Sequence, residues 1–463
     1  MSITLFPDQV TVLEAVRQEY RVGARAPLLV APTGFGKTIV FCAICQGAVA
    51  KGRRIWILVH RQELIDQVSA TLAQFGVPHG IISPQFPSFA HRPVQVASVF
   101  SLVRRMASLT PPDLIVIDEA HHAILASTWG KVIAAFPRAR LLGVTATPAR
   151  LSGEGLGDIF DRLIMGPTVQ ALIDSARLSP VRVFAPPTID IAGVHSAMGD
   201  YKKRELAFAV DKPKVTGDAI THYQTLTPGK RAAVFCVSIE HAQHMAQAAR
   251  TAGISAVQID GKMHIALRRE IIGDFAHGKI SWLVSVDLIS EGFDCPGIDV
   301  GISLRPTQSL GLWLQQCGRI LRVFPGKTGA TILDHAGNSL RHGLPTEQRD
   351  WSLSGSATKG TDAERAASVR VCPRCFSAQR SGRPACANCG APFPVEPRVV
   401  AKAKGTLTEV TQEDIDKRRA RQTVGQTKDL AGLTALGRMR GYKDAERWAQ
   451  YVIQGRERKR AAK

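Results

Sequence analysis

The sequence contains no long uninterrupted hydrophobic run. No stretch approaches the roughly 18 consecutive apolar residues that a membrane-spanning helix needs. Residues 1–9 include Pro7 and Asp8 and have neither a basic start nor an apolar stretch, which argues against a secretory signal. We therefore expect a soluble, cytoplasmic protein that has no membrane partner.

Acidic residues are in the minority. The chain has 39 Asp and Glu against 59 Lys and Arg, a formal net charge of +20. The surplus is uneven, because residues 351–463 alone carry 23 Lys and Arg against 11 Asp and Glu. The positive electrostatic field of such a surface favours binding of a phosphodiester backbone, and this binding should weaken as the salt concentration rises. A basic surface that only confers solubility is the alternative at this stage.

Cysteine is also scarce, with nine in 463 residues, a length that allows about three domains. Five of them are scattered through apolar or catalytic segments: Cys42, Cys45, Cys236, Cys295 and Cys317. We expect these five to be small core residues in a reducing compartment. Cys42 and Cys45 have the C-x-x-C spacing of redox motifs, but their place in an apolar helix favours a core role.

Residues 31–38 read Ala-Pro-Thr-Gly-Phe-Gly-Lys-Thr. Small residues let this backbone curl so that its N–H groups point at phosphates, while Lys37 reaches the β- and γ-phosphates and the Thr38 hydroxyl ligates Mg²⁺. An apolar strand at 28–30 precedes the loop and a helical pattern at 38–49 follows it, so the positive end of a helix adds to the anion site. The nucleotide-binding residues predicted here are Pro32, Thr33, Gly34, Phe35, Gly36, Lys37 and Thr38.

An acidic motif, Asp-Glu-Ala-His-His, occupies residues 118–122 and follows the apolar run 114–117. This order places Asp118 and Glu119 at the carboxyl edge of a parallel sheet, where ligands bind in open α/β folds. Asp118 is then suited to hold Mg²⁺ and Glu119 to orient or deprotonate the attacking water. Each motif alone has a non-functional alternative: the phosphate loop could be a chance glycine-rich turn, and the acidic motif could be a solvated loop.

Short strands alternate with amphipathic helices in two successive series, which is typical of α/β folds with two parallel sheets. The expected strands are 28–30, 55–59, 94–99, 114–118 and 141–147, then 232–237, 256–259, 282–286, 300–304 and 331–334. Helices are expected at 240–251, 265–276 and 310–321, with a short one within 436–454. The predicted domains are 1–166 and 188–345, joined by 167–187. A flexible linker at 346–368, a cysteine-rich segment at 369–396 and a basic tail with short helices at 397–463 are expected to follow.

Several ordered motifs carry a family resemblance. They are 5–9, ending in Gln9; 59–64, with His60 and Arg61; 96–98, ending in Ser98; Thr-Ala-Thr-Pro at 145–148; Ser-Glu-Gly-Phe-Asp at 290–294; and Gln-Gln-Cys-Gly-Arg-Ile-Leu-Arg at 315–322. Over roughly residues 5–337 the chain resembles the superfamily 2 DNA helicases and translocases. Within that superfamily it is similar to the DEAH-type group that includes RadD-like repair ATPases, XPB-like enzymes and phage helicases.

The resemblance implies two RecA-like domains and assigns roles to further residues. Gln9 would read the adenine edge, with Gly292 and Asp294 also in the nucleotide site. The implied nucleic-acid contacts are His60, Arg61 and Ser98. The implied catalytic set is Lys37, Asp118, Glu119, His121, Gln315, Arg319 and Arg322. Departures from the pattern occur at Phe6, Ala31 and Val286.

The two arginines also have a physical rationale. A phosphoryl-transfer transition state spreads negative charge, and an arginine finger is worth about 10³–10⁵ in rate. Arg319 and Arg322 are three residues apart and are expected on one face of a helix of the second domain. The site would then be complete only when two domains close. Surface cations or contacts with DNA are the alternative roles.

Cys372, Cys375, Cys386 and Cys389 form two C-x-x-C pairs that are separated by ten residues. Each pair can form a tight turn that presents two thiolates, with Gly390 relaxing the second, and four thiolates suit a structural Zn²⁺. The spacing is shorter than the commonest one, of about 15–20 residues. Two disulfides are the alternative, and contact with nucleic acid and docking of a protein partner are both open as roles for this zinc ribbon and the basic tail.

These features predict an ATP-dependent DNA helicase or translocase for repair, recombination or replication, with ATP, Mg²⁺ and Zn²⁺ as cofactors and DNA as its partner. The motif spelling resembles DNA-acting relatives, and a grip on phosphates would not select sequence. An RNA-dependent ATPase of the same fold remains a second hypothesis. A clamp that uses ATP only as a switch is a third, although intact Glu119, Arg319 and Arg322 argue against it.

Overall fold

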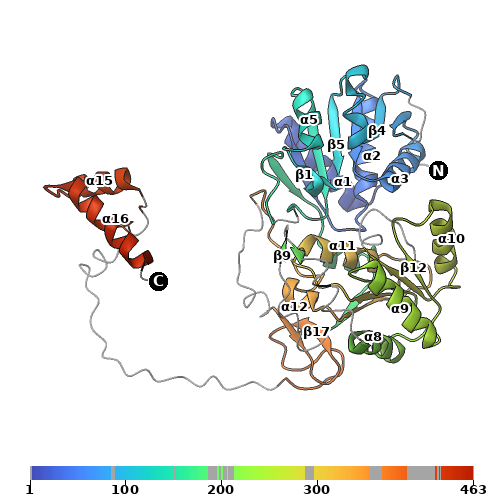
Figure 1. Ribbon diagram of the computed structural model, residues 1–463. Helices are drawn as coiled ribbons and strands as arrows, with labels where there is room; N and C mark the ends of the chain where they lie inside the picture. The colour runs from blue at the N-terminus through green and yellow to red at the C-terminus, as the bar shows by residue number, and fades with distance from the viewer. Residues whose placement is uncertain are drawn as a thin grey trace, which may run out of the picture. The chain divides into compact units, whose positions relative to one another are not determined.

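A computed structural model shows the architecture of the chain (Figure 1). It describes residues 3–84, 89–150, 153–185, 196–197, 200–201, 206, 213–286, 297–354, 368–393, 423–424, 427 and 429–461. The chain forms two compact units, Met1–Pro394 and Val395–Lys463. Each unit is described by itself below.

The first domain of the larger unit is built on a seven-stranded parallel sheet in the order β3-β4-β2-β5-β6-β1-β7. Its strands are β1 (Pro27–Val30), β2 (Ile55–Val59), β3 (His79–Ile82), β4 (Val94–Ser98), β5 (Leu114–Asp118), β6 (Arg140–Thr145) and β7 (Arg162–Met165). Its helices are α1 (Pro7–Arg21), α2 (Lys37–Val49), α3 (Gln62–Gln74), α4 (Val99–Leu102) and α5 (Thr128–Ala135), with 3₁₀ turns at Met106–Ser108 and Ala120–His122. The five predicted strands are confirmed, while β3 and β7 were not predicted.

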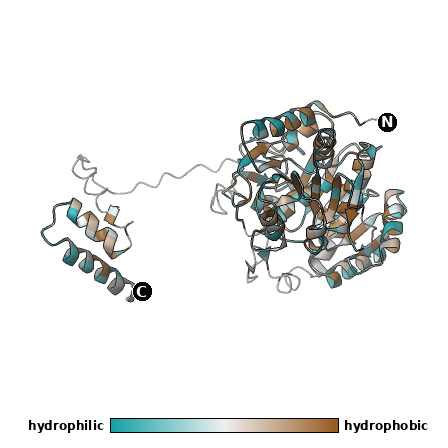
Figure 2. Ribbon diagram, turned by 90° about the horizontal axis from the view of Figure 1, so that it is seen from above, coloured by the Kyte–Doolittle hydropathy of each residue, from teal (hydrophilic) through white to brown (hydrophobic). Residues whose placement is uncertain are grey.

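Both faces of this sheet are buried, as near-continuous apolar strands require. Leu29 belongs to the hydrophobic cluster that includes Val12 of α1, whereas its neighbour Leu28 belongs to the cluster that includes Trp129 of α5. Helices therefore cover the sheet on both sides, and in Figure 2 hydrophobic residues follow the strands in the interior of the unit. No helix among the described residues is both long and apolar enough to cross a membrane.

The second domain is built on an eight-stranded sheet in the order β12-β13-β11-β14-β15-β8-β17-β16. Its strands are β8 (Val181–Phe184), β11 (Ala232–Phe235), β12 (Ala256–Ile259), β13 (Trp282–Ser285), β14 (Val300–Ser303), β15 (Ala330–Asp334), β16 (Val369–Val371) and β17 (Ser377–Arg380). The helices that follow α6 (Val169–Asp174) are α8 (Pro213–Leu226), α9 (Ile239–Thr251), α10 (Ile265–Ala276), α11 (Leu310–Ile320) and α12 (Asn338–His342), and β9 (Ser196–Ala197) pairs with β10 (Asp200–Tyr201). The five strands predicted for this domain are confirmed within one or two residues.

Two segments that looked like connections in the sequence belong to this second sheet. β8 lies inside the predicted linker 167–187, yet it pairs with β15 in parallel and with β17 in antiparallel orientation. The hairpin β16–β17 comes from the cysteine-rich segment, and its Val369 and Ala378 join the same hydrophobic cluster as Val183 of β8. The cysteine-rich segment is therefore an extension of the second sheet, which its spacing from the other strands did not predict.

The chain also returns to the first domain after leaving the second. Residues 345–354, here called the strap, follow α12, and Trp351 and Leu353 pack against the cluster of the first domain that contains Phe160. The N–H of Gly157 donates a hydrogen bond to the Leu353 carbonyl at 2.8 Å. The start of the predicted flexible linker, within 346–354, thus has a defined packing partner.

The smaller unit contains a helical hairpin, α15 (Leu430–Met439) and α16 (Ala445–Ala461). Leu433 and Ala449 are fully buried between the two helices. Short helices were predicted for the basic tail, one of them within 436–454, and the structure has two helices over this region because Gly441, with φ +73°, ends the first of them. A left-handed glycine is a common helix terminator, and the chain reverses there.

Candidate functional site

The phosphate loop joins β1 to α2 and depends on two glycines. Gly34 and Gly36 have φ of +94° and +88°, a region that disfavours other residues. Gly36 also caps α2, and a Cβ there would lie 2.6 Å from Gln9 Nε2. The Lys37 ammonium donates to the Ala31 carbonyl at 3.0 Å and so lies folded within the loop.

Two side chains outside the loop brace it. Gln9 is buried; its Nε2 donates to the Phe35 carbonyl at 2.8 Å, and its Oε1 accepts from the Phe6 N–H at 3.0 Å. Arg177 donates to the carboxylate of Asp8 and to the Phe35 carbonyl, and its guanidinium lies 4.2 Å from the centre of the Phe6 ring. Both ends of the Gln9 amide are therefore hydrogen-bonded within the protein. The adenine contact predicted for Gln9 stays a prediction. Sequence reasoning missed Arg177, whose long-range partners leave no local pattern.

A cavity of about 350 Å³ opens in front of the loop. It is lined by Thr33, Gly34, Gly36, Lys37, Thr38, Leu64, Gln67, Asp118, Glu119, Arg177, Arg319, Arg322 and Val323. The predicted metal and arginine residues of both domains thus face one space with most of the phosphate loop, whereas Pro32 and Phe35 do not line it. That combination of donors and carboxylates fits Mg-ATP, whose triphosphate needs cations and whose metal needs oxygen ligands.

Burial and mutual charge shape the acids and bases of this cavity. Burial and the neighbouring Glu119 carboxylate raise the pKa of Asp118 to about 7, against the pull of Lys37. Burial would also raise the pKa of Glu119, but nearby His121, Lys37 and Arg319 outweigh it and leave this pKa below its ordinary value. Burial lowers the pKa of Lys37, while the two carboxylates oppose that shift. A bound divalent cation would add the positive charge that keeps both carboxylates ionised.

Glu119 has a left-handed backbone, with φ 49° and ψ 53°, which is uncommon for a residue with a side chain. Strain of this kind is often found at functional sites. It occurs at the point where β5 ends and the short 3₁₀ turn at Ala120–His122 begins. The turn brings His121 back beside Glu119, with 3.4 Å between Nδ1 and Oε2.

His121 connects the two domains through hydrogen bonds. Burial lowers its pKa to about 4, so the ring is neutral at physiological pH. The Thr145 hydroxyl donates to the Thr147 carbonyl at 2.8 Å and is 2.9 Å from His121 Nδ1, which assigns the ring proton to Nδ1. His121 Nε2 is then the acceptor for Gln315 Nε2, 3.3 Å away on α11.

One face of α11, the helix that lies next to the first domain in Figure 1, contacts that domain at three positions. A Cβ on Gly311 would lie 3.0 Å from Thr147 Oγ1, and one on Gly318 would lie 2.4 Å from Thr33 Cβ. Gln315 lies between them at helical spacing. Small residues therefore let this helix approach the coupling motif and the phosphate loop closely.

Arg319 and Arg322 both reach the nucleotide cavity, but not from one helical face as predicted. α11 ends at Ile320, and Arg322 lies beyond it in an isolated bridge with Leu178 of the interdomain connection. Arg319 is on the helix and buried. The helix stops before Arg322 because the chain turns to pair with the connection.

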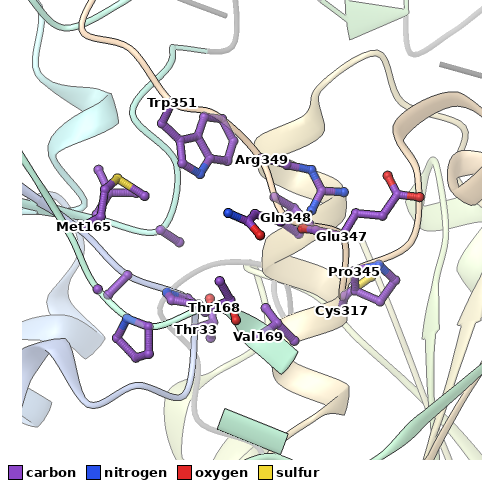
Figure 3. Close-up of a pocket in the computed structure, with 18 of the residues that line it drawn as sticks. Thr33, Met165, Thr168, Val169, Cys317, Pro345, Glu347, Gln348, Arg349 and Trp351 are labelled. Atoms are coloured by element: carbon purple, nitrogen blue, oxygen red, sulfur yellow. Dashed lines mark hydrogen bonds between the residues drawn. The ribbon is translucent and has the colours of Figure 1, made fainter. Parts of the chain in front are cut away.

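A second cavity of about 430 Å³ lies between the domains (Figure 3). Thr33 of the phosphate loop lines one side, Cys317 of α11 another, and the strap contributes Arg349 and Trp351. The domains also pack directly against each other, because one hydrophobic cluster includes Phe35 of the first domain and Cys317 of α11. The cavity interrupts this packing locally.

The predicted nucleic-acid residues lie at strand ends. Val59, the last residue of β2, pairs with Ser98, the last residue of β4, so Ser98 and the nearby Arg61 lie at the same end of neighbouring strands. The ring of His60 packs against His122, with centroids 4.2 Å apart, and burial lowers its pKa to about 3. These contacts stay predictions. Gly292 and Asp294 lie outside the described residues.

The four predicted cysteines of the ribbon converge. Their sulfur atoms all lie within 4.8 Å of one another, with 3.7 Å between Cys372 and Cys389 and 3.7 Å between Cys375 and Cys386. A tetrahedral Zn²⁺ with Zn–S bonds of about 2.3 Å would separate its sulfurs by about 3.8 Å. These four residues are free thiols and not disulfide partners. The cluster is compatible with zinc.

Each cysteine pair closes a similar turn. The N–H of Phe376 donates to the Cys372 carbonyl at 2.8 Å, and that of Gly390 to the Cys386 carbonyl at 2.9 Å. Both donors have positive φ, 58° and 71°. The expected role of Gly390 is confirmed, while the first turn places a left-handed conformation on phenylalanine.

Known families match both domains. Residues 2–150 match the family described as Type III restriction enzyme, res subunit, and residues 212–324 match the Helicase conserved C-terminal domain. The chain belongs to the superfamily 2 helicases. It has two RecA-like domains and is an ATP-hydrolysing enzyme whose activity depends on nucleic acid.

Individual relatives agree with this assignment. A 51.5 kDa protein of a Lactococcus phage is 36% identical over 372 residues, which cover 80% of this chain and 78% of that protein. "Putative ATP-dependent helicase IRC3" of Saccharomyces cerevisiae is 26% identical over 357 residues, covering 72% of this chain and 51% of its own length. The chain thus spans about half the length of that relative.

Among solved structures, the fragment of "a putative HsdR subunit of a type I restriction enzyme" from Vibrio vulnificus has a TM-score of 0.58. It is 22% identical and covers 73% of this chain and 66% of its own. At this identity the likeness supports the fold alone.

Proposed function

We propose that this protein is an ATP-driven DNA translocase or helicase. One observation carries the proposal: α11 of the second domain brings Arg319 to a cavity that already holds Lys37, Asp118 and Glu119 of the first, and the same helix brings Gln315 to His121. An enzyme that only bound ATP would not need a hydrolytic set drawn from two domains. The arrangement couples turnover to the distance between those domains.

In this mechanism the triphosphate lies along the loop 31–38, where the free N–H groups at the start of α2 face it. Lys37 would leave its carbonyl partner to bind the β- and γ-phosphates, and Thr38 and Asp118 are the residues that would hold Mg²⁺. Magnesium supplies charge neutralisation at the transferred phosphoryl group. Glu119 orients the water and accepts its proton, and Arg319 and Arg322 stabilise the charge of the transition state.

The path from Glu119 to the second domain is short. His121 lies beside Glu119 and is hydrogen-bonded to Thr145 and Gln315. A change at the γ-phosphate position that moves Glu119 would therefore shift the acceptor of the Gln315 bond. The Thr145–Thr147 segment responds as well, because it shares the same hydrogen bonds.

DNA is the proposed substrate. The family that matches residues 2–150 is described as a restriction-enzyme subunit. The motif sequences Thr-Ala-Thr-Pro and Arg-Ile-Leu-Arg also favour DNA over RNA as the substrate. Contacts at the strand ends of β2 and β4 would hold phosphates and so would not select a sequence.

The cysteine cluster is proposed to bind one structural Zn²⁺. Its fit rests on the sulfur separations and on two supporting donors: the N–H of Asn388 lies 3.4 Å from Cys386 Sγ, and its Nδ2 lies 3.4 Å from Cys375 Sγ. Such donors stabilise thiolate ligands. Elemental analysis should find one zinc per chain, and Cys375→Ser with Cys389→Ser should abolish it.

The test of the main proposal is ATP hydrolysis with single-stranded, duplex, forked and RNA ligands side by side, together with displacement of a triplex strand as a readout of movement. DNA should stimulate hydrolysis and ATP should drive displacement. Stimulation by RNA alone would establish the RNA-dependent alternative. Stimulation by DNA without displacement would favour the ATP-switched clamp.

A further inference from the structure

A groove of about 520 Å³ lies where the ribbon hairpin meets the second domain, away from the nucleotide cavity. We call it the ribbon groove. Its polar lining comes from four segments: Thr168 and Gln170 near α6, Arg182 on β8, Glu347 and Gln348 in the strap, and Gln379, Arg380, Arg383 and Asn388 in the ribbon. It exists only because β17 pairs with β8.

Gln379 gives the groove a buried donor. Its Oε1 accepts a hydrogen bond from the Ala387 N–H at 2.9 Å, and that donor fixes the orientation of the amide. Its Nε2 then has no acceptor among the described residues, although the residue is only 8% exposed. A buried polar group without a partner is costly, so an acceptor supplied by a ligand would be favoured.

The charges around this donor select an anion. Arg182, Arg380 and Arg383 are exposed and come from two strands and the turn that follows them. Among the residues that the structure describes, Glu347 is the one acidic side chain that lines the groove, and its Oε1 accepts from the Ser368 hydroxyl at 3.3 Å. Three cations and an amide donor around a concave surface match oxygen acceptors that carry negative charge.

We propose that the ribbon groove binds the phosphodiester backbone of the nucleic acid on which the motor acts. The proposal rests on the proposed function, since it names a further contact for the same substrate. No aromatic side chain of the described residues lines the groove, so base stacking by these residues contributes nothing there and the grip is on phosphates. The absence of an aromatic anchor also disfavours a peptide, for which such anchors supply most affinity.

Metal binding and the groove are mechanically linked. Ala387, which orients Gln379, lies inside the second cysteine turn, between Cys386 and Cys389. Asn388, which lines the groove, donates to Cys375 and Cys386. Removal of the metal would free this turn and with it the Ala387 N–H. The Gln379 amide would then no longer be oriented with Nε2 toward the groove, while the nucleotide site would stay unchanged.

The experiment uses the full-length protein and fluorescently labelled single-stranded and duplex DNA, with affinity measured across a salt series in the absence of ATP. Arg182→Gln with Arg383→Gln should lower the slope of log affinity against log salt by about 1.4 on single strands and about 1.8 on duplex, if both contacts are lost. Gln379→Glu, which replaces the donor with a carboxylate, should weaken binding by about tenfold or more. Arg53→Gln, an exposed arginine of the first domain, is the matched control and should change neither quantity.

Zinc content and thermal unfolding should match the wild type in each variant, which shows that the fold persists. Turnover at saturating DNA should also be unchanged, because none of these residues lines the nucleotide cavity. An unchanged salt slope in the double variant overturns the inference, as does selective loss of polyglutamate binding, which would assign the groove to an acidic peptide. If DNA fails to stimulate the wild-type enzyme at all, the proposed function fails instead.

Discussion

Gln315 and His121 are 194 positions apart in the chain, yet Gln315 Nε2 lies 3.3 Å from His121 Nε2 across the domain boundary. The His121 ring is neutral and its Nδ1 is held by Thr145, so Nε2 is a fixed acceptor. The second domain therefore contacts the acidic motif through a directed hydrogen bond. A bond of this kind breaks or forms over a displacement of less than 1 Å.

This bond predicts a separation of ATP hydrolysis from its regulation. Gln315→Ala should retain ATP binding but reduce the stimulation of kcat by DNA by about tenfold or more, because the domains lose their link at His121. ATPase assays with and without saturating DNA provide the measurement. Gln308→Ala, an exposed glutamine just before α11, serves as the control. Equal stimulation in both variants would contradict a coupling role.

The phosphate site predicts distinct effects for its cation and its acid. Lys37→Ala should abolish hydrolysis with the fold intact, because no other lysine lines the cavity. Glu119→Gln should keep Mg-ATP binding and stop turnover, since Asp118 still holds the metal. Nucleotide binding by calorimetry and phosphate release separate the two cases. Failure of Glu119→Gln to bind Mg-ATP would mean that Glu119 and not Asp118 holds the metal.

Arg319 is predicted to act as an arginine finger. Arg319→Ala should lower kcat by about 10³ or more, with little change in DNA affinity, because its charge faces the two carboxylates and Lys37. Arg319→Lys should rescue only a small part of this loss, since a point charge lacks the planar guanidinium. Weaker DNA binding with normal turnover at saturating DNA would place Arg319 on the nucleic acid instead.

The close approach at Gly318 predicts a steric effect. Gly318→Ala would place a methyl group 2.4 Å from Thr33 Cβ, so the helix must retreat from the phosphate loop. We expect a lower kcat and a higher KM for ATP, with stability of the isolated domains little affected. Gly273→Ala in α10, where a Cβ would meet no atom within 4 Å, should leave activity normal and stabilise its helix by about 0.5–1 kcal/mol. Equal activity of the two variants would show that the domains do not close this tightly during turnover.

The basic tail predicts a contribution to DNA affinity that is independent of the motor. Truncation after Pro394 removes the smaller unit and should leave basal ATPase activity unchanged, with weaker DNA binding and a shallower salt dependence. An unchanged slope would favour a protein-docking role for the tail. Truncation at Ser352 should be worse tolerated, because it also removes β17 and exposes the edge of β8.

The chemistry of the site could be predicted from the sequence because it is local. Lys37 and Thr38 belong to one loop, and Asp118 and Glu119 to one strand end, so spacing along the chain was sufficient to group them. The four cysteines were recognisable for the same reason. Periodicity likewise predicted the central strands, since strands buried on both faces are continuously apolar.

Only the tertiary structure decided which contacts form between distant segments. The sequence did not show that Arg177 would brace Phe35, that Arg322 would leave the helix to pair with Leu178, or that β8 and β17 would become neighbours. A short strand such as β8 has no period long enough to separate it from a linker, and its place in a sheet depends on which edge is free to accept it. Likewise, Gly318 is an ordinary helical glycine until Thr33 lies against it. The spacing of residues along the chain is sufficient to predict a site built from one segment, whereas contacts between distant segments arise only when the chain packs.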